Sequence, residues 1–410
     1  MDRREFMMAA AALGAGLGWS SVAMARGPGG SGRLLVVMLR GAYDAASLLV
    51  PVSSDDYYAA RPNIAIGRPG SGAGEALRLD ADWGLHPAAK AVHALYGRGQ
   101  ALFIPFSGNS TAPRSHFEAQ DLMEAGLAPG SSITSASGWM GRLMERTGAA
   151  RPGMGALAFA QSVPLSLKGK VAVPNVSGQV GKAVNERSDD MMRRLYGGSA
   201  LEGMANQGVQ TRERVAREMR EMSMDPGGVQ AEMVAADRGA RPAAAGLSAQ
   251  FGAIAKVMRV DPLASVAFVD VGGWDTHVGQ GASEGQLAGK LGALSDALGV
   301  YAASMGPAWN DTVVVVMSEF GRTFRENGNR GTDHGHGTTL WVLGGGIKGG
   351  RVAGAQERVG FASLNEGRDL KVLNDYRGVA SEVLAGLYGL GASDLSHIFP
   401  SAPRSGVGLF

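Results

Sequence analysis

Three of the seven histidines lie in two short clusters that also hold acidic residues. In the first cluster, GGWDTH at residues 272–277, Asp275 precedes His277 by two positions. Side chains two apart share a face of an extended chain, whereas in a helix they diverge, so this spacing lets both groups reach one ion. The alternative is an aspartate-capped turn with a solvent-exposed histidine.

The second cluster, GTDHGHG at residues 331–337, holds Asp333, His334 and His336 among glycines. Three imidazoles with carboxylates and no thiol suit Zn²⁺ or Mn²⁺, and further oxygen ligands would admit Ca²⁺. We therefore predict one or two divalent metal ions as the cofactor. The alternative is a flexible surface loop rich in glycine and histidine.

Two further acids follow apolar stretches of the chain. Asp44 comes after the run 34–39, and Glu319 comes after the run 312–317. Because open α/β sheets place their sites at the carboxyl ends of strands, both acids are candidate metal ligands. Arg322 lies close enough in sequence to bind an anion. Taken singly, each acid would be typical of a turn or of a helix N-terminus.

Ser115 and His116 follow a third apolar run, residues 101–104. Consecutive residues of an extended chain point in opposite directions, so adjacency does not make them a Ser-His dyad. Ser115 is the candidate for an attacking hydroxyl, and His116 is a candidate acid or a further metal ligand. A turn built on serine and asparagine is the alternative for this segment.

The apolar runs also predict the fold class. Runs 34–39, 101–104, 266–269 and 312–317 have the length and continuity of strands buried on both faces. Helical patterns lie between them, as in the leucines of residues 287–298. This alternation predicts an α/β protein with a mostly parallel central sheet and helices on both faces.

One detail conflicts with a purely parallel sheet. His334 and His336 precede the apolar run 340–343, whereas the other candidate residues follow their runs. All of them meet at one edge only if the run 340–343 is antiparallel to the rest, or if the glycine-rich loop folds back.

Changes in composition along the chain predict its domain organisation. Residues 1–25 are set apart as a signal peptide, 26–160 as the first part of the core, 161–260 as an inserted β/helical subdomain and 261–410 as the second part. The insert starts with a segment containing Val, Pro and Gly that could form small strands. From about residue 186 it is polar, rich in Met and helical in pattern.

The overall composition narrows the classes of protein. The chain has 410 residues, 45% hydrophobic and 19% charged, and no Cys. That excludes thiolate zinc sites, iron–sulfur clusters and disulfide-stapled scaffolds. The net charge is +2 and there is no basic run, so we expect no nucleic-acid partner.

The N-terminus has the features of an export signal. Arg3 and Arg4 precede an uncharged stretch, residues 6–24, and Ala23 and Ala25 are small residues at the positions that a signal peptidase reads. We predict a twin-arginine signal, the twin-arginine export machinery as a partner, and a periplasmic or secreted protein. The alternative is a membrane anchor, against which the glycines and serines of this stretch argue.

These motifs occur together and in order along nearly the whole chain. On their basis the chain resembles the bacterial domain-of-unknown-function 1501 family, which is usually placed in the alkaline phosphatase and sulfatase superfamily. The motifs are Leu39-Arg40-Gly41 with Asp44, RSHFEAQ at 114–120, GGWDTH at 272–277, SEFGRT at 318–323 and GTDHG at 331–335. The resemblance implies an alkaline-phosphatase-like α/β core with a helical insertion.

The superfamily resemblance also implies metal-dependent hydrolysis of a phosphate or sulfate ester, with a small or polymeric anionic ester as substrate. An acid resembling Asp44 would share a metal with a late Asp-His pair. Here that position reads Glu319-Phe320, a departure that removes one expected imidazole. Asp275 and His277 are similar to the superfamily's other ligands.

Ser115 is similar in place to the superfamily nucleophile, which stands at a helix start after an early strand. It lacks a diagnostic motif around it. The second hypothesis is therefore a non-catalytic, metal-stabilised periplasmic binding or assembly protein on the same fold.

Overall fold

The centre of the protein is an eight-stranded sheet. Its strand order is β10-β5-β9-β8-β1-β7-β6, and β11 pairs with β5. At its middle, β1 (Arg33–Leu39) lies parallel to β7 (Val266–Val271) and β8 (Thr312–Met317). Alternate residues of β1 enter opposite cores, as Leu35 and Leu34 do. Strands apolar on both faces require such cover, so the predicted buried strands are confirmed.

Strand β9 (Thr338–Gly344) runs against its neighbours. It is antiparallel to β8 on one side and to β5 (Ala101–Gly108) on the other. The other pairings described in this sheet are parallel, including those of β5 with β10 (Arg351–Val352) and with β11 (Asn374–Asp375). The sheet is therefore mixed and mostly parallel, and the loop before β9 begins at the edge where β8 ends.

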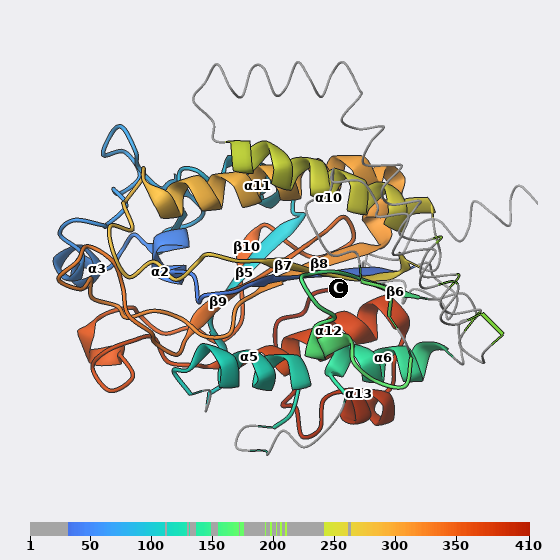
Figure 1. Ribbon diagram of the computed structural model, residues 1–410. Coiled ribbons are helices and arrows are strands. Elements are labelled where there is room, and N and C mark those ends of the chain that lie inside the picture. Colours follow the sequence, from blue (N-terminus) through green and yellow to red (C-terminus); the bar gives the residue numbers. More distant parts are fainter. Residues whose placement is uncertain are drawn as a thin grey trace, which may run out of the picture.

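Helices cover both faces of the sheet (Figure 1). One face packs against α10, α11 and α4, and the other packs against α6, α12 and α13, with α5 on the same side. The bounds are α4 (Lys90–Gly97), α5 (His116–Ala125), α6 (Trp139–Gly148), α10 (Pro242–Val260), α11 (Gln286–Met305), α12 (Tyr376–Tyr388) and α13 (Ala392–Ile398). The α/β class predicted from the sequence is confirmed.

Smaller elements surround this core. A three-stranded antiparallel sheet has the order β2-β4-β3, and β6 (Ala156–Phe159) ends the main sheet beside β7. The remaining elements are α2 (Ala45–Leu48), β2 (Leu49–Pro51), α3 (Asp55–Ala60), β3 (Leu77–Arg78), β4 (Trp83–Leu85), η1 (Leu165–Leu167), η3 (Gly306–Asp311), η4 (Phe361–Ser363).

The computed structural model describes residues 32–110, 113–128, 131, 137–148, 155–171, 173–175, 193, 197–198, 202, 206, 210, 242–260 and 264–410. The predicted signal peptide, residues 1–25, and most of the predicted insert lie outside this part. Helix α10, at the end of the range assigned to the insert, packs on α11 and buries Phe251 and Ile254 in the main core.

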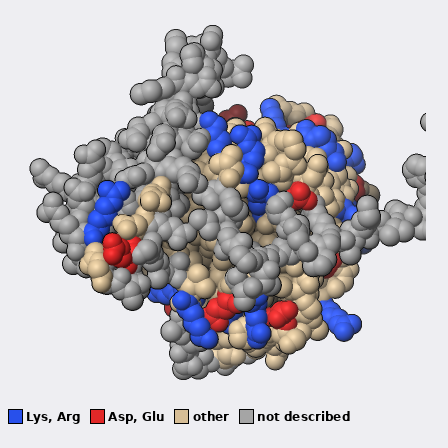
Figure 2. Space-filling model, turned by 90° about the vertical axis from the view of Figure 1, so that its right-hand side faces the viewer, with Lys and Arg blue, Asp and Glu red and all other residues tan. Residues whose placement is uncertain are grey.

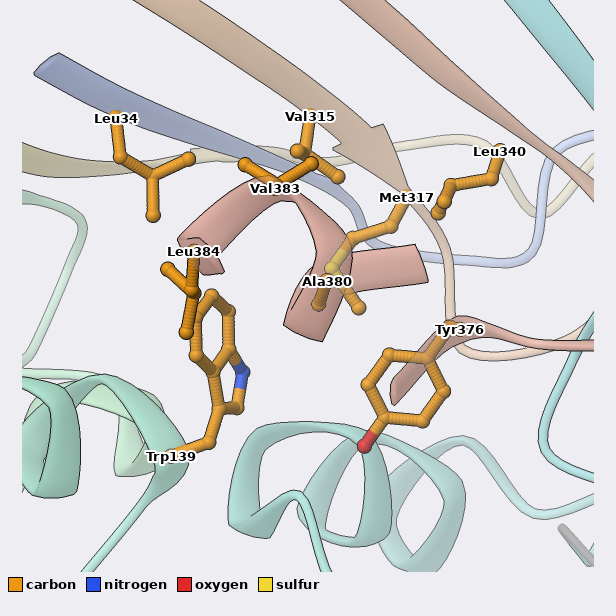
Figure 3. Close-up of a pocket in the computed structure, with 9 residues that line it drawn as sticks. All are labelled: Leu34, Trp139, Val315, Met317, Leu340, Tyr376, Ala380, Val383 and Leu384. Atoms are coloured by element: carbon orange, nitrogen blue, oxygen red, sulfur yellow. The ribbon is translucent and has the colours of Figure 1, made fainter. Parts of the chain in front are cut away.

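A small internal cavity lies between the sheet and α12 (Figure 3). Its walls are almost wholly apolar, and the hydroxyl of Tyr376 donates a hydrogen bond to the carbonyl of Met123. Such a cavity is a packing gap and offers no polar groups to orient a ligand. It is lined by Leu34, Trp139, Val315, Met317, Leu340, Tyr376, Ala380, Val383 and Leu384.

Across the described helices, none combines the length and apolar character needed to cross a membrane. On the face that Figure 2 shows, the described Lys and Arg side chains lie near Asp and Glu side chains. Charges of both signs therefore share this face.

Candidate metal centre

Four side chains from three separate segments meet at the carboxyl end of the parallel strands. Asp275 and His277 come from the loop after β7, His334 from the loop before β9, and His116 is the first residue of α5. We call these four residues the imidazole cluster. They meet because β9 is antiparallel, which returns its preceding loop to the edge where β7 and β8 end.

The ligand atoms of the imidazole cluster face one another. The Nε2 atom of His277 lies 3.1 Å from Nε2 of His334 and 3.0 Å from Oδ1 of Asp275. One nitrogen of His116, one nitrogen of His334 and one carboxylate oxygen of Asp275 all lie within 4.8 Å of one another. These three residues form a possible metal-binding group. Of the four residues of the imidazole cluster, the sequence predicts Asp275, His277 and His334 as metal ligands and His116 as an acid or a further ligand.

The opposite ring nitrogens show which atoms carry lone pairs. Nδ1 of His334 lies 2.9 Å from the carbonyl oxygen of Arg114, and Nδ1 of His277 lies 3.1 Å from Oδ1 of Asp333. Both oxygens accept, so both Nδ1 atoms donate, and in a neutral imidazole each Nε2 then carries a lone pair. Burial also lowers the pKa of His334, which favours its neutral form.

The Nδ1 atom of His116 also faces an oxygen acceptor, in this case the carboxylate of a buried glutamate. Its Nδ1 lies 2.8 Å from Oε1 of Glu319, a side chain fully shielded from solvent. Its Nε2 is buried without a hydrogen-bond partner among the described residues. The hydrogen bond with Glu319 raises the pKa of His116, although burial opposes the shift. The ring is held between Phe320, at 4.9 Å, and His334, at 4.4 Å between centroids.

The sequence predicts Glu319 and Asp333 as metal ligands, but in the structure both carboxylates bind histidine side chains. Each carboxylate receives the Nδ1 hydrogen of an imidazole, so each orients a histidine whose Nε2 faces the cluster. Burial alone would raise the pKa of Glu319, but its hydrogen bonds with His116 and Gln120 hold it below the ordinary value. Carboxylates that hold metal-binding histidines in this way are a regular feature of metal sites.

Arg322 lies beneath the cluster with its side chain fully buried. It donates to the carbonyl oxygens of Gly41, Ala42 and Thr332 and forms an ion pair with Asp275. Burial would raise the pKa of Asp275, but the hydrogen bond and charge of Arg322 hold it low. The predicted anion-binding role finds no support here, because the guanidinium donors are engaged by the protein itself.

Asp44 is also drawn into a different interaction. It forms a buried, two-pronged ion pair with Arg61, with contacts of 2.5 and 3.0 Å. Oδ2 also accepts from Ser47 and Gln280, each at 2.7 Å. Both carboxylate oxygens are therefore occupied, and the structure does not bring Asp44 into the imidazole cluster as a ligand.

His336 turns to another partner although it lies two positions after His334. Its Nδ1 is 3.0 Å from Oδ1 of the buried Asp369. Side chains two positions apart share a face in a regular strand, but His334 and His336 lie in a loop that packs closely against neighbouring segments. A Cβ on Gly335 would lie 2.6 Å from the carbonyl oxygen of Arg322, and one on Gly337 would lie 2.3 Å from a neighbouring carbonyl oxygen.

Ser115 is the N-cap residue of α5 and makes no side-chain capping bond. It is partly buried and directly precedes His116 in the chain. The structure therefore keeps Ser115 beside the cluster without showing a base at its hydroxyl.

Several residues of the site were not assigned a role from the sequence. Arg61 and Asp369 determine where Asp44 and His336 point, and they lie 17 and 33 positions from these partners in the chain. Gln120 carried a readable signal, because it follows His116 by four positions and so shares its face of α5.

Fold and site together define a mixed α/β protein with a candidate metal centre at the carboxyl end of its sheet. A family model described as "Protein of unknown function (DUF1501)" matches residues 31–398, and the chain belongs to this family. A search of curated proteins finds no match.

Proposed function

We propose that this protein is an exported, metal-dependent hydrolase of a phosphate or sulfate ester. One observation carries the proposal: a nitrogen of His116, a nitrogen of His334 and a carboxylate oxygen of Asp275 lie within 4.8 Å of one another, and Nε2 of His277 lies 3.1 Å from Nε2 of His334. Two Nε2 atoms that each carry a lone pair repel at this distance, and a bound divalent cation would relieve that repulsion. The alkaline-phosphatase-like core and the choice of an ester substrate come from the resemblance in sequence motifs, and the site's position at the carboxyl end of the sheet agrees with them.

The donor set fits a single divalent ion held by His116, Asp275, His277 and His334. Imidazole nitrogens favour Zn²⁺ or Mn²⁺ over Ca²⁺, which prefers oxygen ligands. Such an ion, when bound, supplies a Lewis acid that polarises the ester and offsets developing negative charge.

The remaining chemistry would fall to α5. Ser115 stands at the N-terminus of this ten-residue helix, where the helix dipole favours a negatively charged group. Its hydroxyl is the candidate nucleophile. Arg322 would act by fixing Asp275 beneath the substrate.

The test begins with metal analysis of the purified protein, followed by turnover of aryl phosphate, phosphodiester and aryl sulfate substrates. His277→Ala should lose both bound metal and turnover, while His397→Ala, on α13, serves as the matched control. Ser115→Ala should retain metal and lose most turnover. Full activity of His277→Ala would contradict the proposal.

A non-catalytic binding or assembly protein is the second candidate function. The contacts of Arg322 favour this candidate. Its guanidinium binds backbone carbonyls and Asp275, so it is not free to bind an anionic ester. Metal-replete protein without turnover on any substrate of the panel would establish this alternative over the hydrolase.

Export rests on residues 1–25, which lie outside the described part of the chain. Replacing Arg3 and Arg4 with Lys should retain the protein in the cytoplasm. Processed protein that still reaches the periplasm would contradict a twin-arginine route.

A further inference from the structure

One face of α5 carries a row of polar side chains behind the cluster. His116, Gln120 and Glu124 are spaced by four positions and so lie along one side of the helix. His116 and Gln120 both reach the same atom, Oε1 of Glu319, at 2.8 and 2.9 Å. The backbone N–H of Gly41 donates to that atom as well, at 2.8 Å. Three donors therefore fix this carboxylate.

The direction of the Gln120 amide is fixed in turn by Arg40. Nη1 of Arg40 donates to Oε1 of Gln120 at 2.7 Å, so the amide oxygen faces a cation and the amide N–H faces Glu319. The other nitrogens of Arg40 bind Glu124 on α5 and Asp270 on β7, at 2.7 and 2.6 Å. Arg40 thus joins α5 to the end of the central strands.

We infer that Arg40 and Gln120 are positioning residues that set the metal affinity of the imidazole cluster by holding Glu319 and, through it, His116. The inference rests on the proposed metal site. Without the Arg40 contact, the side-chain amide of Gln120 is free to rotate and to place its oxygen next to the carboxylate of Glu319. The two oxygens repel each other. Glu319 then moves, and His116 no longer keeps Nδ1–H on Glu319 with its Nε2 lone pair toward the ion.

Removing a partner that orients a metal-binding histidine typically weakens metal affinity by about 10–100-fold. The side chain of Arg40 is 24% exposed, but those of its partners Glu124 and Asp270 are 5% and 21% exposed, so Arg40→Met also leaves shielded carboxylates unpaired and lowers stability. Gln120→Met keeps these ion pairs, so its effect should appear in metal binding more than in folding.

The experiment measures the dissociation constants of Zn²⁺ and Mn²⁺ by competition with a chromogenic chelator, for full-length protein stripped of metal. Arg40→Met and Gln120→Met should each raise the dissociation constant about 10–100-fold, and Arg40→Lys should recover part of the loss. Arg351→Met is the matched control, because the hydrogen bonds that Arg351 makes among the described residues go to the backbone carbonyls of Lys348, Val407 and Gly408.

A second readout needs no metal. The ring ¹⁵N shifts of His116 should show one tautomer, with Nδ1 protonated, in the wild type and a mixture in Arg40→Met. Unchanged dissociation constants in both variants, or a lowered melting temperature of the metal-free protein without a change in affinity, would overturn the inference. Wild-type protein that binds metal but hydrolyses no ester would remove the proposed hydrolase and leave this inference standing.

Discussion

Two polar regions of this protein, the network around Asp44 and the imidazole cluster, differ in whether their hydrogen-bond acceptors meet donors. Around Asp44, every acceptor meets a donor: Arg61 forks onto both oxygens, and Ser47 and Gln280 add hydrogen bonds. In the imidazole cluster, the Nε2 atom of His116 lies 3.6 Å from Oδ2 of Asp275 and has no hydrogen-bond partner among the described residues, and two other Nε2 atoms face each other at 3.1 Å.

The difference separates a structural network from a candidate binding site. Burial would raise the pKa of Asp44, but the charge and hydrogen bonds of Arg61 hold it below its ordinary value, so the region is stable as it stands. In the cluster, by contrast, Nε2 of His116 is left without a hydrogen-bond partner among the described residues, which is consistent with the ion that we propose there. The acids and imidazoles that follow strands in the sequence predict that such side chains gather at one edge of the sheet. Only the balance of hydrogen-bond donors and acceptors in the structure distinguishes a satisfied network from a candidate ligand site.

Removing the cation of the Asp44 network should have the largest effect. Arg61→Met leaves a buried carboxylate unpaired, so we expect the free energy of unfolding to fall by about 3–5 kcal/mol, measured by denaturant titration. The folded fraction should still bind metal with wild-type affinity. If this variant does not fold, Asp44→Asn keeps the side-chain shape and tests the same point. Loss of metal from folded Asp44→Asn would make Asp44 a ligand after all.

His334→Ala should affect metal binding and spare the fold. Removing one of four ligands should raise the Zn²⁺ dissociation constant about 100-fold, which corresponds to about 2.7 kcal/mol. The metal-free melting temperature should stay near the wild-type value. His336→Ala is the matched control, since His336 pairs with Asp369, and its affinity should stay within about threefold of wild type. Equal losses in both variants would place His336 in the site.

Gly335→Ala should act on both properties to a smaller degree. The added Cβ would meet the Arg322 carbonyl oxygen at 2.6 Å, so we expect a loss of about 1–2 kcal/mol in stability together with weaker metal binding. Gly84→Ala, where the Cβ would meet Ala76 at 2.8 Å in the small sheet, should cost stability alone. Unfolding curves and chelator competition on both variants check the contrast, and an unaltered affinity in Gly335→Ala would contradict it.

Much of the fold could be predicted from local pattern. The apolar run 312–317 coincides with β8, and the run 34–39 differs from β1 by one residue. Asp275, His277 and His334 could also be grouped, because their short spacing places them beside strand ends. What the sequence could not show was the partner of each charged group.

Those partners depend on contacts between distant segments. Arg61 takes Asp44 out of the cluster, and Asp369 does the same for His336, although neither pairing has a local signature. Arg322 has the right place for an anion, but its donors are used by carbonyls that only the folded loops bring near.

The reversed direction of β9 has a consequence for the order in which the chain can assemble during synthesis. Strand β5, which leads to α5 and His116, pairs in the main sheet with β9, β10 and β11, and all three lie in the last quarter of the chain. His116 therefore cannot reach its final place until nearly the whole polypeptide has left the ribosome. Long-range pairing of this kind slows folding, so the candidate metal group forms late, and capture of the proposed ion would report that β5 has paired with β9.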